Sequence, residues 1–241
     1  MFHSVLFDQV DLSILLSLNH LLAGSNVKLK ILDQVGNNPL IRGSPIFFAL
    51  VSIWFITNSI EARSRILVGV LASCLATGVS VSLQEHWTPH LRPLLDTSLP
   101  LNLVGVARIE DWHGRLGSFP SDTASLFFSL CAVIFLQRRS MGLLCLLWAL
   151  VTVGVARVAL GWHYPSDIVG GLLLGPTVVF LLSRPEWPRR IGASFLRKFE
   201  GREYIVHSIY FLLLADAYYL FPGLQDIYRI TKKSIAIMFS F

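Results

Sequence analysis

Charged side chains are scarce in this sequence. Only 15% of the 241 residues are charged, whereas a soluble domain carries about a quarter. Hydrophobic residues make up 54% of the chain, and its mean hydropathy is +0.61. This composition excludes an ordinary soluble domain, and we expect one membrane domain over residues 1–241. The net charge of +5 forms no basic stripe, which excludes a nucleic-acid platform and favours contact with anionic membrane lipids.

Paired cysteines, glycine-rich nucleotide loops and carboxylate clusters are missing as well. The three cysteines are odd in number, form no Cys-x-x-Cys pair and lie inside apolar runs. They are expected to be buried packing residues rather than disulfides or metal ligands. Without a nucleotide loop or a carboxylate cluster for magnesium, we expect neither a cofactor nor a metal.

Long apolar runs are what the sequence does contain. A membrane span needs about 20 apolar residues. Six runs approach this length, of which the third is short and draws on flanking residues: 44–60, 65–83, 122–137, 141–161, 166–183 and 203–221. They predict an all-α bundle of six membrane spans, with the first five, over 44–183, forming a catalytic core.

Two further segments flank the spans. In residues 10–24, leucines and isoleucines recur at helical spacing, with Asp11, Asn19 and His20 elsewhere around the wheel. This pattern predicts a short amphipathic helix in the membrane interface. The tail 223–241 is too polar to span and is expected to lie at the surface.

Arginine-rich connections predict how the chain is oriented. They lie between spans one and two, three and four, and five and six: 61–65, 137–140 and 184–202. Because cytoplasmic loops of membrane proteins carry an excess of Lys and Arg, we expect these connections on the cytoplasmic side. Loop 84–121 and the turn 161–165 then share the opposite face, which we expect to be the extracytoplasmic face of a bacterial inner membrane.

Polar residues gather on that shared face in three clusters: His90–Pro93, Gly117–Ala124 and Arg157–Asp167. The second and third each carry Pro-Ser-Asp at the start of an apolar helix. Proline suits the first helical position, and the next backbone N–H groups lack partners within the helix. Because such a helix start binds anions, we expect the two starts to converge on one anion.

An imidazole and two guanidinium groups complete a predicted phosphate site. Arg92 and Arg157 supply forked donors that match phosphate oxygens. His163 lies four residues before Asp167, whose carboxylate at that reach holds one imidazole nitrogen and leaves the other as nucleophile or base. These residues predict phosphate chemistry with a histidine nucleophile at the membrane surface.

The clusters resemble the motifs of the phosphatidic acid phosphatase type 2 superfamily, the histidine acid phosphatase fold of membrane lipid phosphatases. The family motifs are Lys-x6-Arg-Pro, Pro-Ser-Gly-His and Ser-Arg-x5-His-x3-Asp. This chain has Glu85-x6-Arg92-Pro93, Pro120-Ser121-Asp122-Thr123 and Ala156-Arg157-x5-His163-x3-Asp167. The resemblance covers residues 40–185 and is greatest to the bacterial undecaprenyl pyrophosphate phosphatase branch.

The resemblance implies a role for each matching residue. It implies that His163 attacks phosphorus and becomes phosphohistidine, and that Asp167 orients it. The residues implied to hold the phosphoryl oxygens are Arg92, Arg157, Ser121, Asp122 and Thr123. The implied partners are a lipid-linked phosphate and membrane lipids, and the oligomeric state stays open.

Three positions depart from the family pattern. Glu85 stands where the family has lysine, Ala156 where it has serine, and Thr123 where it has the histidine that protonates the leaving group. If Glu85 points elsewhere, Arg108 or Arg115 of the same loop are candidates to replace the lysine charge.

Thr123 leaves three interpretations open. A phosphate leaving from an anhydride is already acidic, with a second pKa near ~6, and needs no proton, which favours a polyprenyl pyrophosphate substrate. Alternatively, His113 acts as the acid from the same loop. In the third interpretation the chain has lost hydrolysis.

We therefore expect a membrane lipid phosphatase that acts on a lipid-linked phosphate or pyrophosphate. Two alternatives use the same scaffold. One is a phosphotransferase that hands the phosphoryl group to a lipid or sugar acceptor, and the other is a non-hydrolytic lipid-binding or transport protein.

Overall fold

A computed structural model describes residues 5–86, 91–103 and 117–218 of the chain. Within these ranges the structure is helical, apart from one isolated bridge between Leu91 and Gly117. The prediction of an all-α fold is confirmed for this part. Four earlier predictions lie outside the described residues: those for Arg108, His113, Arg115 and the tail 223–241.

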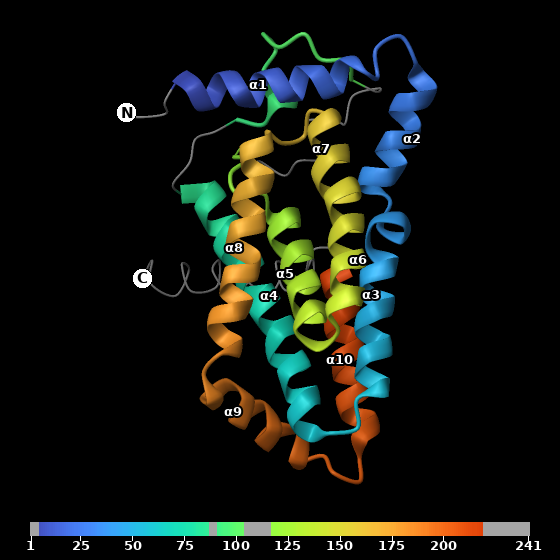
Figure 1. Ribbon diagram of the computed structural model, residues 1–241, viewed down its shortest axis with the longest axis vertical. Coiled ribbons are helices and arrows are strands. Elements are labelled where there is room, and N and C mark those ends of the chain that lie inside the picture. The colour runs from blue at the N-terminus through green and yellow to red at the C-terminus, as the bar shows by residue number, and fades with distance from the viewer. Residues whose placement is uncertain (1–4, 87–90, 104–116, 219–241) are drawn as a thin grey trace, which may run out of the picture.

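The helices run in chain order as α1 (Val5–His20), α2 (Asn26–Asn37), α3 (Pro39–Ile56), α4 (Ile60–His86), α5 (Asp122–Gln137), α6 (Arg139–Ala149), α7 (Ala156–Ala159), α8 (Pro165–Ser183), α9 (Glu186–Arg197) and α10 (Glu203–Tyr218). A short helix, η1 (Pro93–Leu95), follows α4, and a π-helical turn, η3 (Leu150–Val155), joins α6 to α7. Figure 1 shows the long helices as an elongated bundle with α1 lying across one end.

Four helical stretches are long and apolar enough to cross a membrane: Asn26–Ile56, Ile60–Glu85, Arg139–Ala159 and Pro165–Ser183. This confirms the membrane character of the chain. The other two predicted spans coincide with shorter helices, because α5 has 16 residues and α10 has 16 within the described part.

One predicted connection was wrong, and another is helical. The connection predicted at 61–65 is the first turn of α4, because α3 ends at Ile56 and α4 begins at Ile60. Ser59 sets this start, since its side chain accepts a hydrogen bond from the Ala62 amide at 3.1 Å, as helix-capping serines do. The basic segment 184–202, predicted as a linker, is largely the helix α9.

The first helix turns two polar side chains toward the bundle. Asp11 and Asn19 are buried against the bundle, whereas Val10 and Ile14 are exposed. Asn19 donates a hydrogen bond to the Ala159 carbonyl at 2.8 Å and accepts one from the Asn102 amide at 2.7 Å. The polar side chains of α1 therefore fasten it to the end of the bundle where α7 finishes.

Helix α5 is the centre of the bundle. Every residue from Asp122 to Ile134 is buried, and α5 packs against α4, α6 and α8. Gly171 of α8 permits a close approach, because a Cβ there would lie 2.6 Å from Ala124 Cβ and 2.8 Å from the Ser121 carbonyl oxygen. Small residues at such positions let membrane helices approach closely. The contact brings the first turns of α5 and α8 together.

Replacing Gly171 with alanine is expected to lower the melting temperature of the detergent-purified protein. The added methyl group has no space and must push α8 away from α5, and overpacking of this kind costs about 1–3 kcal/mol. Gly78→Ala is the matched control, since a Cβ at Gly78 meets nothing within 4 Å. Equal melting temperatures for the two variants would contradict this account of the α5–α8 contact.

Candidate active site

The three polar clusters meet at the end of the bundle that α1 crosses. The Ser121 amide donates to the Asp167 carbonyl oxygen at 3.0 Å, which joins the starts of α5 and α8 directly. The Leu94 amide donates to the Gly161 carbonyl oxygen at 2.8 Å, and Leu91 pairs with Gly117. Backbone hydrogen bonds thus connect each cluster to the other two.

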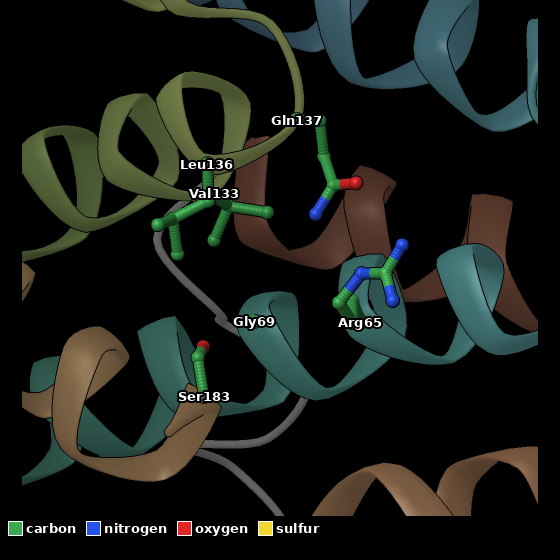
Figure 2. A pocket seen from close by; sticks show the side chains of 6 residues that line it. All are labelled: Arg65, Gly69, Val133, Leu136, Gln137 and Ser183. Carbon is green, nitrogen blue, oxygen red and sulfur yellow. The ribbon is translucent and has the colours of Figure 1, made fainter.

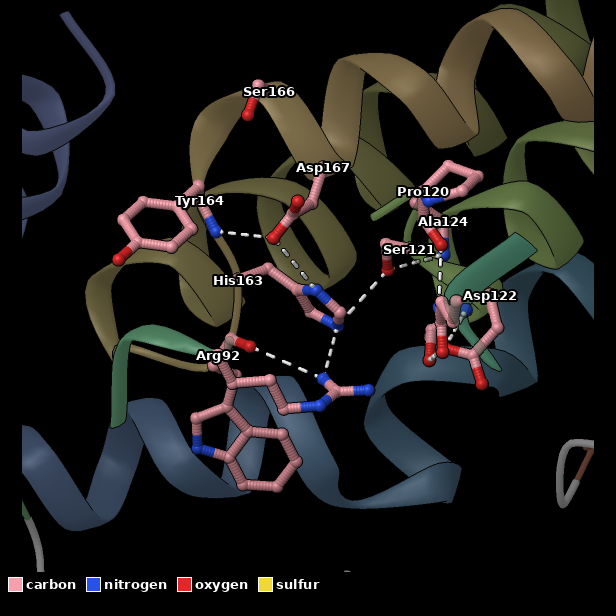
Figure 3. Close-up of polar contacts among 12 residues, drawn as sticks. Arg92, Pro120, Ser121, Asp122, Ala124, His163, Tyr164, Ser166 and Asp167 are labelled. Carbon is pink, nitrogen blue, oxygen red and sulfur yellow. Dashed lines mark hydrogen bonds and ion pairs between the residues drawn. The ribbon is translucent and has the colours of Figure 1, made fainter. Parts of the chain in front are cut away.

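His163 is the centre of this arrangement (Figure 3). Its Nε2 lies 2.9 Å from Arg92 Nη1 and 3.3 Å from Ser121 Oγ, and its Nδ1 lies 3.4 Å from Asp167 Oδ2. A guanidinium only donates hydrogen bonds, so Nε2 is the acceptor and the ring proton sits on Nδ1, facing Asp167. The lone pair of Nε2 therefore points toward the arginine side of the site.

Asp167 is held in place by its own helix. Its Oδ2 accepts the Tyr164 amide at 2.8 Å, and it is the third residue of α8. Both His163 and Asp167 are fully buried. The carboxylate is thus positioned to hold the Nδ1–H of the imidazole.

The imidazole is neutral in this environment. Burial, followed by the nearby Arg92 charge, lowers the pKa of His163 from 6.5 to about 4, although Asp167 opposes the shift. Burial disfavours the charged form of a histidine. At neutral pH the Nε2 lone pair is therefore available as a nucleophile.

Two buried arginines lie beside this nitrogen. Arg92 also donates to the Trp162 carbonyl oxygen at 3.3 Å. Arg157 lies with its guanidinium carbon 4.8 Å from the centre of the Trp162 ring, and its Nε has no hydrogen-bond partner in the described part of the chain. Buried guanidinium donors of this kind suit an anion.

The helix starts are arranged differently from the prediction. We expected free amides at both, but at α8 this was wrong: the Ser166 amide donates to Asp11 Oδ1 at 3.0 Å, and the Ser166 hydroxyl donates to Asp11 Oδ2. An acid on α1 therefore caps α8 from outside.

The prediction of free amides was wrong at α5 as well, because local side chains cap that helix. The Thr123 amide donates to Asp122 Oδ1 at 2.8 Å, and the Ala124 amide donates to Ser121 Oγ at 3.3 Å. Asp122 and Thr123 are both buried, and Ser121 Oγ is the side-chain atom of this group that reaches His163.

Arg92 and Arg157 are buried, whereas Glu85, at the position of the family lysine, is exposed. Its neighbour Gln84 is buried and donates to the Pro120 carbonyl oxygen at 2.6 Å, and Ser80 donates to the same oxygen at 2.7 Å. Neither Gln84 nor Ser80 was predicted to belong to the site, although two polar residues four apart in an apolar run are a signal of an inward-facing role.

Within the described residues no group of three or more His, Cys, Asp or Glu side chains is arranged to hold a metal ion. A pocket at the opposite end of the bundle, where α4 begins and α5 and α8 end, is shown in Figure 2. Its lining residues are Arg65, Gly69, Val133, Leu136, Gln137 and Ser183. It contains no histidine or carboxylate that would activate Ser183, and it is remote from His163.

Comparison with known proteins finds similarity over the same part of the chain. A model of the PAP2 superfamily matches residues 87–190, which contain all three clusters. The chain is 32% identical over 133 residues to the Bacitracin transport permease protein BcrC of Bacillus licheniformis, covering 54% of this chain and 60% of that protein. It is 31% identical over 137 residues to the Undecaprenyl-diphosphatase BcrC of Bacillus subtilis (strain 168), covering 56% and 64%.

A shorter match joins the chain to a Lipid A 1-phosphatase of Rhizobium etli, at 38% identity over 66 residues, 26% of this chain and 27% of that protein. The chain thus matches less than two thirds of the length of these curated relatives. No solved structure matches the chain.

His163 is expected to stay neutral well below the pH at which an ordinary histidine is protonated. Its pKa of about 4 lies below 6.5, so the folded protein resists protonation, and as pH falls below 6.5 the unfolded chain binds the proton first and stability decreases. Histidine-labelled NMR, with His163 assigned from a His163→Gln variant, measures this directly. A midpoint near 6.5 for His163, like that of an exposed histidine, would contradict the buried geometry.

Proposed function

We propose, from the membership of residues 87–190 in the PAP2 superfamily, that this chain is a membrane lipid phosphatase whose nucleophile is His163. One observation carries the proposal: the neutral Nε2 lies 2.9 Å from Arg92 Nη1 in a buried site, with Asp167 behind Nδ1. The names of two relatives support it, since they describe an undecaprenyl-diphosphatase and a lipid A 1-phosphatase.

The proposed reaction has two steps. In the first, Nε2 attacks phosphorus, the bond to the leaving oxygen breaks, and the oxygen departs with the electron pair. Asp167 stabilises the positive charge that develops on the ring while it holds the Nδ1 proton. In the second, water attacks phosphorus and loses a proton to solvent, the phosphorus–nitrogen bond breaks with its electron pair returning to Nε2, and neutral His163 is regenerated.

Arg92 changes its hydrogen-bond partner during this reaction. In the resting site Arg92 Nη1 donates to Nε2. When a phosphate enters, the same donor is transferred to a phosphoryl oxygen, which frees the lone pair for attack. Catalysis then comes mainly from positioning and from stabilisation of the charge on the phosphoryl oxygens.

The favoured substrate is a polyprenyl pyrophosphate. Thr123 is not able to protonate a leaving alkoxide near neutral pH, whereas a leaving phosphate needs little help, because its second pKa is near ~6. His113 remains the alternative acid and lies outside the described residues.

Membrane placement follows from the same proposal. We place the chain in a bacterial inner membrane as a six-span bundle, with α5 and α10 as the shorter spans and the site at the extracytoplasmic face. The exposed Val10 and Ile14 side chains of α1 then contact lipid at the interface. The long lipid chain enters sideways between spans.

Two further functions use the same residues. A phosphotransferase would deliver the phosphoryl group to a lipid or sugar acceptor instead of water. A non-hydrolytic binding or transport protein has support in the name of one relative, a bacitracin transport permease, and in the absence of the second-motif histidine at Thr123. Assays with and without an acceptor separate hydrolysis from transfer.

Replacing His163 with alanine is expected to abolish phosphate release from a polyprenyl pyrophosphate. Loss of a catalytic nucleophile commonly lowers the rate by about 10³-fold or more. The measurement is phosphate release by full-length protein in detergent, with His20→Ala as the control because His20 is an exposed histidine at the end of α1. Unchanged function in His163→Ala would favour the non-hydrolytic protein.

Replacing Thr123 with histidine is expected to extend activity toward lipid monophosphates. The new imidazole would stand where the family places its acid, and a positioned acid contributes about 10²-fold or more. The ratio of monophosphate to pyrophosphate turnover is measured in the same preparation, so that pyrophosphate activity reports folding. An unchanged ratio would indicate that His113 or another group supplies the proton.

A further inference from the structure

A third buried arginine belongs to the surroundings of the site. Arg42 of α3 is 5% exposed. It lies outside the three motifs and outside residues 87–190, the range that matches the PAP2 superfamily. The family motifs therefore assign no role to Arg42.

The side chain of Arg42 lies against the first part of α5. Its guanidinium carbon is 5.1 Å from the centre of the Phe127 ring. Phe127 follows Thr123 by four residues on α5, so the two share a helix face. Arg42 is therefore placed beside the end of α5 at which Ser121 and Asp122 begin the helix.

Most of the hydrogen-bonding capacity of Arg42 is unused in the described part of the chain. Nη1 donates to the Gly36 carbonyl oxygen at 3.4 Å, a long bond, and the buried Nε has no partner. A guanidinium carries five N–H donors. A side chain that served only to hold α2 against α3 would not need a buried, forked cation.

The charge around Arg42 indicates what its free donors bind. Arg42 and Arg92 both act electrostatically on Arg157, and Asp122 is the one carboxylate among the described residues that acts on Arg42 and on Arg157. Buried like charges repel and are expensive to keep without a counter-charge. A bound anion with several oxygens would relieve this repulsion.

We propose that Arg42 is a substrate-binding residue, a third guanidinium that holds the second phosphate of a lipid pyrophosphate. This rests on the proposed function and extends it. Arg42 supplies from α3 the cation that the family takes from the lysine of its first motif, where this chain has the exposed Glu85. Arg108 and Arg115, the replacements considered from sequence, lie outside the described residues.

The chain offers a matched control for Arg42. Arg63 of α4 also lies over an aromatic ring, with its guanidinium carbon 5.7 Å from the centre of Trp54, and its buried Nε also has no partner. It lies near the start of α4, at the opposite end of the bundle from α1 (Figure 1). Substitution of Arg63 therefore removes a comparable side chain without approaching His163.

The test measures the binding of inorganic pyrophosphate and of inorganic phosphate to full-length protein in detergent. Each Kd is obtained from the rise in melting temperature that the ligand causes. Arg42→Gln is expected to raise the Kd for pyrophosphate by about tenfold or more, as loss of charge-assisted hydrogen bonds does. The Kd for phosphate should change less, and Arg63→Gln should bind both anions as the unmodified protein does. Arg42→Lys keeps the charge without the fork and should raise the pyrophosphate Kd by an intermediate factor.

Release of phosphate from farnesyl diphosphate by the same preparations separates two failures. Suppose that the unmodified protein hydrolyses this substrate, and that the Arg42→Gln variant binds pyrophosphate as tightly as the unmodified protein. The role of Arg42 is then overturned, and the proposed function stands. If Arg42→Gln does not fold, Arg42→Lys decides, and an unchanged pyrophosphate Kd overturns the role. If the unmodified protein neither binds pyrophosphate nor releases phosphate, the proposed function fails and this inference fails with it.

Discussion

The contact between Arg92 and Nε2 of His163 is the constraint on which the site depends. A guanidinium at 2.9 Å requires Nε2 to accept, which puts the ring proton on Nδ1 beside Asp167. Both side chains are buried, so neither can turn to water. The close approach of α8 to α5 at Gly171 and the capping of α8 by Asp11 hold this geometry from two directions. The scaffold therefore sets the protonation state of the nucleophile as well as its position.

Much of the site was predictable from sequence because its residues sit at the ends of apolar runs. Arg92, Ser121, His163 and Asp167 are polar where charge is expensive, and their spacing placed them on one face. The burial of Asp11 was not predicted, because a short helix with mixed faces is normally expected to turn its polar residues toward water. Its partner, the amide of Ser166, lies 155 residues away along the chain, and no local pattern reveals such a pairing.

Other features required the packed structure. The π-helical turn over Leu150–Val155 has no sequence signal, and the start of α4 depends on a cap at Ser59 rather than on hydropathy. Arg42 reads in sequence as an ordinary arginine near the start of a span, and only the packing of α3 against α5 puts it beside Phe127. Packing also distinguishes the two departures from the family motifs. Glu85 is exposed, whereas Thr123 is buried at the start of α5.

The most direct test of the account is to look for the covalent intermediate. Full-length protein is mixed with farnesyl diphosphate labelled in its terminal phosphate, quenched into alkali during the first turnover, and digested for mass spectrometry. We predict label on the peptide that carries His163, with the phosphoryl group on the imidazole. First-turnover release of phosphate with no label on His163, or with label on a different residue, would contradict the assignment of His163 as the nucleophile.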